Sequence, residues 1–439
     1  INDTICPIPV AIAPPFTPIL NKKIKTAALA GLSALALASC SSTNKIAKED
    51  NATKPNSYMD TDAKYLILSN DQRATINKGN EFAVNLFKTQ IDMQSKVISP
   101  LSVSYLMGML ANGADGDTQK EILASLGVGD VSLQTLNESY RALLNSTATA
   151  DKQTTINIAN YIAADKHFSL KSDFRNTVGK MYDAGVESLD FSSSKAVDKI
   201  NQWCSKQTNG MIPKIVDQLS ASDVAVLMNA IYFEGTWETP FEKELTKEEN
   251  FRGYTRDIKR VQMMHQEDNF SYLSNNTFEA VTLPYGNRTY NMTVLLPKEG
   301  VSIEEMMKQL DAQKIGSLYR DMEKCVVDLK LPKFTTSTEV VLNDAISKLG
   351  APSIFTGAAN FKNMSDASIF ISKMLQKAKI EVSEEGTKAA AITAGMVAMT
   401  ALNPDEPRHV KFHANRPFVY IITERQTGAI FFIGQYLGE

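Results

Sequence analysis

Cysteine is scarce in this sequence, with four residues among 439. Cys6 and Cys40 precede the segment that we expect to fold, so Cys204 and Cys325 remain for the body of the chain. This low number excludes a scaffold held together by disulfides. It leaves open whether Cys204 and Cys325 pair with each other or stay as buried thiols. Neither belongs to a Cys-x-x-Cys pair or has a histidine nearby, so we expect no metal site.

An excess of charge of one sign is also missing. The 46 Lys and Arg residues nearly balance 49 Asp and Glu residues, which gives a net charge of -3. A near-neutral chain without basic blocks argues against nucleic acid as a partner, because such binding depends on neutralising phosphates. With 43% hydrophobic residues, the chain is long and apolar enough to bury a large core.

Signatures of enzymes are absent as well. The sequence contains no G-x-S-x-G, H-E-x-x-H, G-x-x-x-x-G-K-[ST] or G-x-G-x-x-G motif. His167, His265, His409 and His413 lie in no motif with a candidate nucleophile. Residues 264–268, which include His265, could form a metal or acid–base cluster, but we interpret them as a polar turn between strands. We therefore expect no catalytic residue, no cofactor and no enzymatic activity.

The N-terminal region carries sorting signals rather than a folding pattern. A basic head at residues 21–25 is followed by small and apolar residues at 26–38. This run is too short to span a membrane permanently, and residues 20–39 are typical of a secretory signal peptide. Cys40 follows Leu-Ala-Ser, as in a bacterial lipobox, where the cysteine becomes lipidated. The alternative is an ordinary signal peptide with an incidental cysteine.

The segments around this signal complete the predicted organisation. Residues 1–19 are proline-rich and patternless, and we interpret them as read-through from an upstream start. Residues 40–66 are polar and are expected to form a flexible linker. Residues 67–439 show no repeat and no break in composition, which predicts one domain. The protein is then exported and anchored by lipid to the bacterial envelope, on its periplasmic or cell-surface face.

The body of the chain mixes helical and strand periodicities. Apolar residues recur at helical spacing in segments 80–90 and 102–112. Apolar or alternating segments typical of strands occupy residues 156–164, 225–233, 281–288, 290–296, 326–331, 419–422 and 429–433. Helices dominate the first half and strands the second, which predicts an α+β fold with mostly antiparallel sheets.

Residues 384–400 form the most unusual segment, because small uncharged side chains dominate it. As a strand, it would place Thr387, Ala389 and Ala391 on one face, with its only later charge, Lys388, on the other. Since no proline interrupts it, every backbone N–H could join a ladder. Such a segment could be an exposed loop, or it could slide between two strands. Its alanine content equally permits a helix.

This segment resembles the hinge that begins the reactive loop of the serpin family. The matching residues are Glu384, Glu385, Gly386, Thr387, Ala389, Ala390 and Ala391. Residues 412–422 fit the C-terminal signature of the same family, and residues 97–104, 227–237 and 327–334 resemble further family segments. The resemblance covers residues 67–439. It implies helices packed around mostly antiparallel sheets, with an exposed reactive loop.

The resemblance implies a suicide-substrate inhibitor of serine proteases that acts as a monomer. The protease cuts the loop, remains attached as an acyl-enzyme, and the loop inserts into the central sheet from Thr387 onward. The family's loop length puts the reactive bond between Thr400 and Ala401, with Met399 as the alternative. Small or medium apolar residues there favour elastase-like or subtilisin-like targets, with some cysteine proteases as further candidates.

The resemblance also implies a gate that controls the opening of the sheet. Its residues are Ser99, Ser102, Asn229, Gln376 and Trp237. Where the family usually has a histidine, this chain has Gln376, which can hydrogen-bond toward Ser99, Ser102 and Asn229 but cannot carry a charge. Two other functions remain open: a serpin-fold protein that only binds a ligand, and a surface lipoprotein that captures nutrients.

Overall fold

The computed structural model describes residues 66–387 and 407–438. These residues belong to the compact unit Met59–Glu439. Several predicted features lie outside the described residues. They are the signal peptide at 20–39, Cys40, most of the linker, Ala389, Ala390, Ala391, Met399, Thr400 and Ala401.

Helices dominate the first half of the described chain, as the sequence predicts, and three more follow in the second half. The helices are α1 (Asn70–Lys88), α2 (Pro100–Gly113), α3 (Gly116–Ser125), α4 (Leu133–Ala150), α5 (Ser172–Tyr182), α6 (Ser194–Gln207), α7 (Ile303–Lys308), α8 (Ala312–Asp321) and α9 (Asn343–Lys348). Helix α1 begins with a capping box, in which the Ser69 side chain accepts from the Gln72 backbone and the Gln72 side chain accepts from Ser69. None of the helices in the described ranges is long and apolar enough to cross a membrane.

A nine-stranded sheet takes up most of the second half. Its order is β1-β15-β14-β8-β7-β6-β9-β13, with β5 paired to β6. The strands are β1 (Lys96–Ile98), β5 (Lys247–Arg252), β6 (Ile258–Ser274), β7 (Phe278–Pro284), β8 (Tyr290–Pro297), β9 (Glu323–Pro332), β13 (His409–His413), β14 (Phe418–Glu424) and β15 (Ile430–Tyr436). The strand-like segments predicted at residues 281–288 and 290–296 correspond to β7 and β8, which pair antiparallel.

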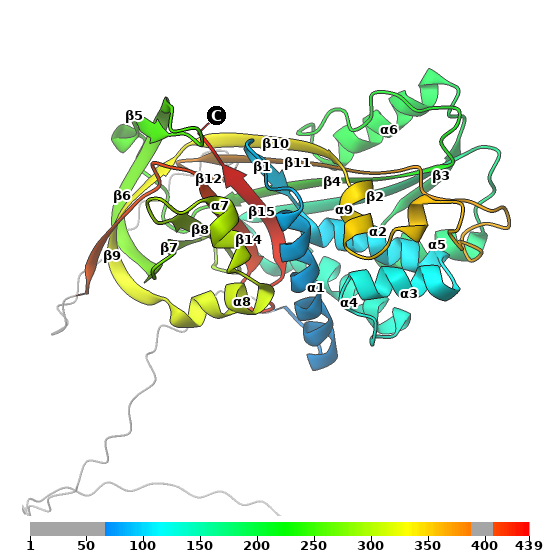
Figure 1. Ribbon diagram of the computed structural model, residues 1–439, viewed down its shortest axis with the longest axis horizontal. Coiled ribbons are helices and arrows are strands. Elements are labelled where there is room, and N and C mark those ends of the chain that lie inside the picture. The colour runs from blue at the N-terminus through cyan, green and yellow to red at the C-terminus, as the bar shows by residue number, and fades with distance from the viewer. Residues whose placement is uncertain (1–65, 388–406, 439) are drawn as a thin grey trace, which may run out of the picture. The chain divides into compact units, whose positions relative to one another are not determined.

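A six-stranded sheet runs in the order β10-β11-β12-β4-β2-β3. Its strands are β2 (Thr154–Asp165), β3 (Gly185–Leu189), β4 (Ala225–Thr236), β10 (Phe334–Val341), β11 (Lys373–Ser383) and β12 (Gly386–Thr387). Figure 1 shows α2, α3 and α5 on one side of this sheet and α6 on the other. The predicted α+β fold with mostly antiparallel sheets is confirmed.

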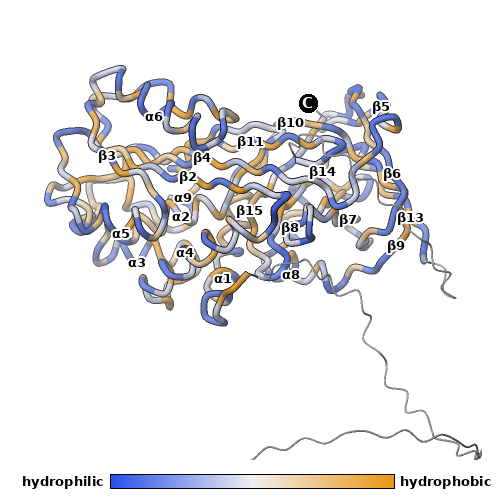
Figure 2. Tube along the Cα trace, turned by 180° about the vertical axis from the view of Figure 1, so that it is seen from behind, coloured by the Kyte–Doolittle hydropathy of each residue, from blue (hydrophilic) through white to orange (hydrophobic). Residues whose placement is uncertain are grey.

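Alternate residues of β4 face two different hydrophobic cores. Leu227 and Ile231 belong to the larger core, which also contains α2. Val226, Met228 and Ala230 belong to a smaller core under α6. This is the period-two pattern of a strand buried on both faces, and Figure 2 shows the apolar colour along β4 and β2, whereas β5 is mainly hydrophilic.

The two cysteines of the body are free thiols. Cys204 lies on α6 in the smaller core, and Cys325 lies on β9 in the larger one. Burial raises the pKa of Cys204 to about 12, so this thiol stays protonated and inert at neutral pH. Cys204 and Cys325 therefore do not form the disulfide that the sequence left open.

The predicted turn around His265 is wrong, because His265 lies inside the long strand β6. Polar residues alternate with buried ones along this strand. The polar side chains therefore lie on the outer face of the sheet and do not mark a turn. The His265 Nε2 atom lies 3.0 Å from Asp328 Oδ1 on β9, and His413 Nε2 lies 3.1 Å from Asp328 Oδ2.

Candidate functional site

The candidate site lies where β4 and β11 separate. These strands pair in parallel from Val226 opposite Lys373 to Ile231 opposite Ala378. Farther along, β12 stands between them and pairs antiparallel with both. We call the region between β4 and β11, from the last directly paired residues Ile231 and Ala378 to β12, the β4–β11 seam. The hinge predicted from the sequence therefore sits at one end of this seam, with Gly386 and Thr387 already in the sheet.

Only glycine fits the backbone at position 386. Its φ angle is +146°, a conformation that L side chains rarely adopt. A Cβ atom built on Gly386 would meet the carbonyl oxygen of Gly235 at 2.1 Å. Because that obstacle is backbone, it cannot move aside as a side chain would. The glycine of the hinge motif is thus required by the close approach of β12 to β4.

Thr387 is fully buried between the two strands. It lies opposite Val382 of β11 and Gly235 of β4. Its Oγ1 atom is 2.7 Å from the hydroxyl of Tyr285, which follows β7. Tyr285 was not predicted from the sequence, since it lies about a hundred residues before the hinge and is part of the strand-like segment 281–288.

Trp237 lies beside the hinge, directly after β4. Its indole Nε1 donates to the carbonyl of Ser383 at 2.9 Å, and its backbone N–H donates to the carbonyl of Glu385 at 3.0 Å. The ring stacks on Tyr285 with a centroid distance of 4.4 Å. Trp237 was predicted to belong to the gate, but it lies at the hinge.

The two hinge glutamates are each held by a lysine. The buried Glu384 carboxylate lies 2.9 Å from Lys333 Nζ and accepts from Thr246 Oγ1 at 3.0 Å. The more exposed Glu385 lies 2.5 Å from Lys243 Nζ. Burial by itself raises the pKa of Glu384, but hydrogen bonds from Lys333, the backbone and Thr246 outweigh it, so its pKa lies below the usual value. Both lysines were missed by the sequence analysis.

Replacing Lys333 with Met is expected to destabilise the protein at neutral pH by about 1–3 kcal/mol, because it leaves the Glu384 carboxylate buried without its cation. In the wild type the lowered pKa of Glu384 adds stability above the unfolded value of about 4.3, and this stability is lost as the pH falls through the folded pKa. In the variant, burial raises that pKa instead, so the deficit should shrink from pH 7 to pH 5.

Urea unfolding of both proteins at several pH values measures this difference. Lys243→Met is the matched control, because the Glu385 pair is more exposed and should contribute less to stability than the Glu384 pair. Equal losses for the two variants, or a loss at Lys333 that does not depend on pH, would contradict the assignment of Lys333 to a buried carboxylate.

The predicted gate lies within the parallel-paired region of β4 and β11, around Gln376, which is opposite Asn229. This fully buried side chain accepts from the Ser99 backbone N–H at 3.0 Å and donates to the Ser99 carbonyl at 2.9 Å. It also lies 3.2 Å from Ser102 Oγ and 3.3 Å from Asn229 Oδ1. The expected hydrogen bonds of Gln376 are therefore present, and they join β11, β4 and the start of α2. Their role as a gate stays a prediction.

Replacing Gln376 with Leu is expected to lower the free energy of unfolding by roughly 2–4 kcal/mol, since it leaves the Ser99 backbone N–H and Asn229 Oδ1 buried without the partner that Gln376 gives them. The wild-type gate contains no titratable group. Gln376→His should therefore add a pH dependence, with stability falling below about pH 6.5 because a buried histidine resists protonation. Thermal melting between pH 5 and 8 tests both variants, and a neutral Gln376→Leu would show that water replaces the lost partners.

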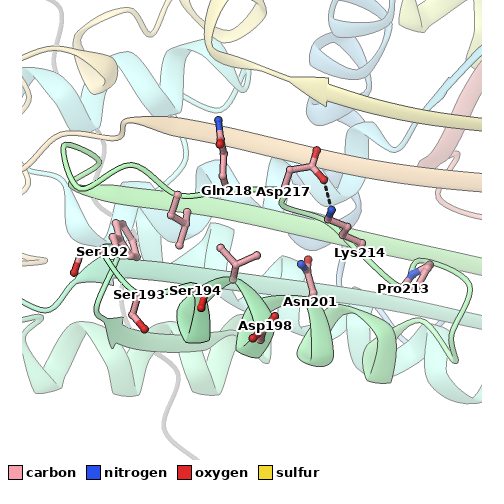
Figure 3. A pocket seen from close by; sticks show the side chains of 12 residues that line it. Ser192, Ser193, Ser194, Asp198, Asn201, Pro213, Lys214, Asp217 and Gln218 are labelled. Atoms are coloured by element: carbon pink, nitrogen blue, oxygen red, sulfur yellow. Dashed lines mark ion pairs between the residues drawn. The ribbon is translucent and has the colours of Figure 1, made fainter.

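Among the described residues, none of the predicted site residues lines the surface cavity beside α6. This cavity has a volume of about 560 Å³ and lies between α6 and residues 213–219 (Figure 3). Its mouth carries an ion pair between Lys214 and Asp217 at 2.5 Å. Within the described ranges, no group of three or more His, Cys, Asp or Glu residues could hold a metal ion. The candidate site is thus a seam in a sheet, not a pocket.

Residues 77–438 match the family described as Serpin (serine protease inhibitor). Iripin-2 of Ixodes ricinus is 31% identical, over 84% of this chain and 95% of its own length. The leukocyte elastase inhibitor of Equus caballus is 30% identical, over 83% of this chain and 99% of its own length.

Two solved structures show the same fold. The thermophilic serpin Tengpin in its native state superposes with a TM-score of 0.77 at 30% identity, covering 83% of this chain and 94% of its own. Human thyroxine-binding globulin complexed with thyroxine also gives a TM-score of 0.77, at 27% identity, covering 84% of this chain and all of its own.

Proposed function

This chain belongs to the serpin family, and from that premise we propose that it is a suicide-substrate inhibitor of serine proteases. The observation that carries the proposal is the place of the hinge. Gly386 and Thr387 occupy the mouth of the β4–β11 seam and pair with both strands. The residues that follow them in the same row, Ala389 and Ala391, are small. A loop that starts in the sheet and continues with small side chains is suited to further insertion.

In the proposed reaction, the protease supplies all the chemistry. Its serine hydroxyl attacks the carbonyl of Thr400, the amine of Ala401 leaves with a proton, and an ester joins Thr400 to the protease. Cleavage frees the new end at Thr400, which lets the loop follow Thr387 into the sheet. Inhibition requires this insertion to be faster than hydrolysis of the ester. If the bond is shifted by one residue, Met399 takes the place of Thr400.

The residues around this bond favour proteases that accept small or medium apolar side chains. Elastase-like and subtilisin-like serine proteases have such preferences, and some cysteine proteases are further candidates. The leukocyte elastase inhibitor among the relatives supports this choice. We propose that the active form is a monomer, because the hinge and the seam belong to one chain.

A second candidate is a serpin-fold protein that binds a ligand without inhibiting. The similarity to thyroxine-binding globulin supports this second candidate function. The experiment that separates the two is to mix the purified protein with elastase and, separately, with subtilisin, and then to run a denaturing gel. An inhibitor gives a covalent band larger than either protein and loss of protease activity. A loop that is cut without any such band would support the binding protein.

We further propose that residues 20–39 direct export and that Cys40 is lipidated, which would hold the domain at residues 67–439 on the bacterial envelope. Changing Cys40 to Ser should move the protein from the membrane fraction to the soluble fraction and leave inhibition unchanged. One cysteine bearing several acyl chains anchors a protein firmly, at about 0.8 kcal/mol per buried methylene. Cys6→Ser is the matched control and should stay in the membrane fraction. Wild-type protein found free in the medium would overturn the anchor.

A further inference from the structure

A buried pair of hydroxyls lies at the hinge. The Tyr285 hydroxyl and Thr387 Oγ1 are 2.7 Å apart, and both side chains are fully buried. Burial holds the pKa of Tyr285 well above its ordinary value, so the phenol keeps its proton and remains able to donate. Thr387 is its hydrogen-bond partner among the described residues.

Tyr285 has little freedom to move away from Thr387. Its ring stacks on Trp237 and meets the ring of Phe233 edge to face at 5.0 Å. Its Cδ1 atom would be 3.0 Å from a Cβ atom built on Gly235, so the ring lies against the backbone of β4. The hydroxyl is therefore a fixed point at the mouth of the β4–β11 seam.

The other contacts of the hinge do not reach Thr387 in this way. The ion pairs with Lys333 and Lys243 hold Glu384 and Glu385, which precede the inserted residues. The ladder of β12 is only two residues long, and so short a strand contributes little by itself. The side chain of the first inserted residue is thus held by Tyr285.

We propose that Tyr285 is a positioning residue that keeps Thr387 seated in the sheet of the intact protein. Insertion then starts from a residue that is already in the sheet. This makes insertion faster relative to hydrolysis of the ester. This role in inhibition rests on the proposed function, whereas the seating of Thr387 does not. Losing either hydroxyl would let the hinge leave the sheet, so that insertion must first bring it back.

The test is a double-mutant cycle of Tyr285→Phe and Thr387→Val, because each change removes one hydroxyl and keeps most of the packing. The first readout is hydrogen–deuterium exchange of the backbone amides at Gly386 and Thr387 in the intact protein. Each single variant should raise the exchange rate roughly five- to tenfold. The double variant should raise it no further, because the same hydrogen bond is lost once. Tyr290→Phe is the control, since its buried hydroxyl has no hydrogen-bond partner among the residues that the structure describes, and it should leave exchange unchanged.

The second readout is the number of inhibitor molecules consumed for each elastase molecule blocked, which should rise in both single variants. Unchanged exchange in Tyr285→Phe and Thr387→Val, or additive effects in the double variant, would overturn the seating of Thr387. If exchange rises as expected but the wild type forms no covalent complex, the seating stands and the inhibitory function fails. If exchange rises and the wild type inhibits, but the consumption ratio of the variants stays the same, the role of Tyr285 in inhibition is wrong.

Discussion

Replacing Thr387 with Arg is expected to turn the protein from an inhibitor into a substrate of its target protease. Thr387 is fully buried between β4 and β11, with its hydroxyl on Tyr285. A guanidinium there would be a buried charge without a partner, which costs several kcal/mol. Since each 1.4 kcal/mol on a barrier slows a step about tenfold, insertion would lose the race against ester hydrolysis.

The measurement is the number of inhibitor molecules consumed for each protease molecule blocked. We expect this ratio to rise from near one to more than about ten, in line with a barrier raised by more than 1.4 kcal/mol. Ala390→Arg is the matched control, because the alternation of a strand puts residue 390 on the face opposite Thr387. It adds the same charge to the same segment and should change the ratio much less. A ratio that is unchanged in Thr387→Arg would mean that loop insertion is not the mechanism.

The parts of the site that could be predicted are those whose residues stand next to one another in the sequence and form a motif. The hinge motif stands in one stretch, and Gly386 proves to be required by its close approach to Gly235. The strand period also predicts that Asn229 faces the same side as Leu227 and Ile231. That side is the one from which Ser99 and Gln376 approach, so the hydrogen bonds of Gln376 could be anticipated.

The partners of the hinge could not be predicted, because the fold brings them from distant parts of the chain. Lys333, Lys243 and Tyr285 are ordinary surface or core residue types in the sequence, and only the sheet order places them around the hinge. Trp237 was assigned to the gate for a related reason. It comes eight residues after Asn229 in the sequence, and at about 3.3 Å per residue a strand carries it to the other end of the sheet.

The second large effect concerns stability. Cutting the loop near Thr400 with a protease that is not trapped should raise the melting temperature by several degrees. In the intact protein, β4 and β11 pair directly only as far as Ile231 and Ala378, and β12 adds two residues at the far end. A fully inserted loop would extend β12 along the whole seam and replace the parallel pairing with antiparallel ladders on both sides, which are slightly more stable per residue.

The size of this effect follows from the added ladder. Each inserted residue adds a ladder hydrogen bond worth roughly 1 kcal/mol, and the entropy of ordering the loop offsets part of this gain. A few kcal/mol of net gain already shift the melting temperature by several degrees. Calorimetry of intact and cleaved protein measures the shift, and cleaved Thr387→Arg is the control that should gain much less. Equal melting temperatures for intact and cleaved wild type would contradict insertion and favour a family member that binds without inhibiting.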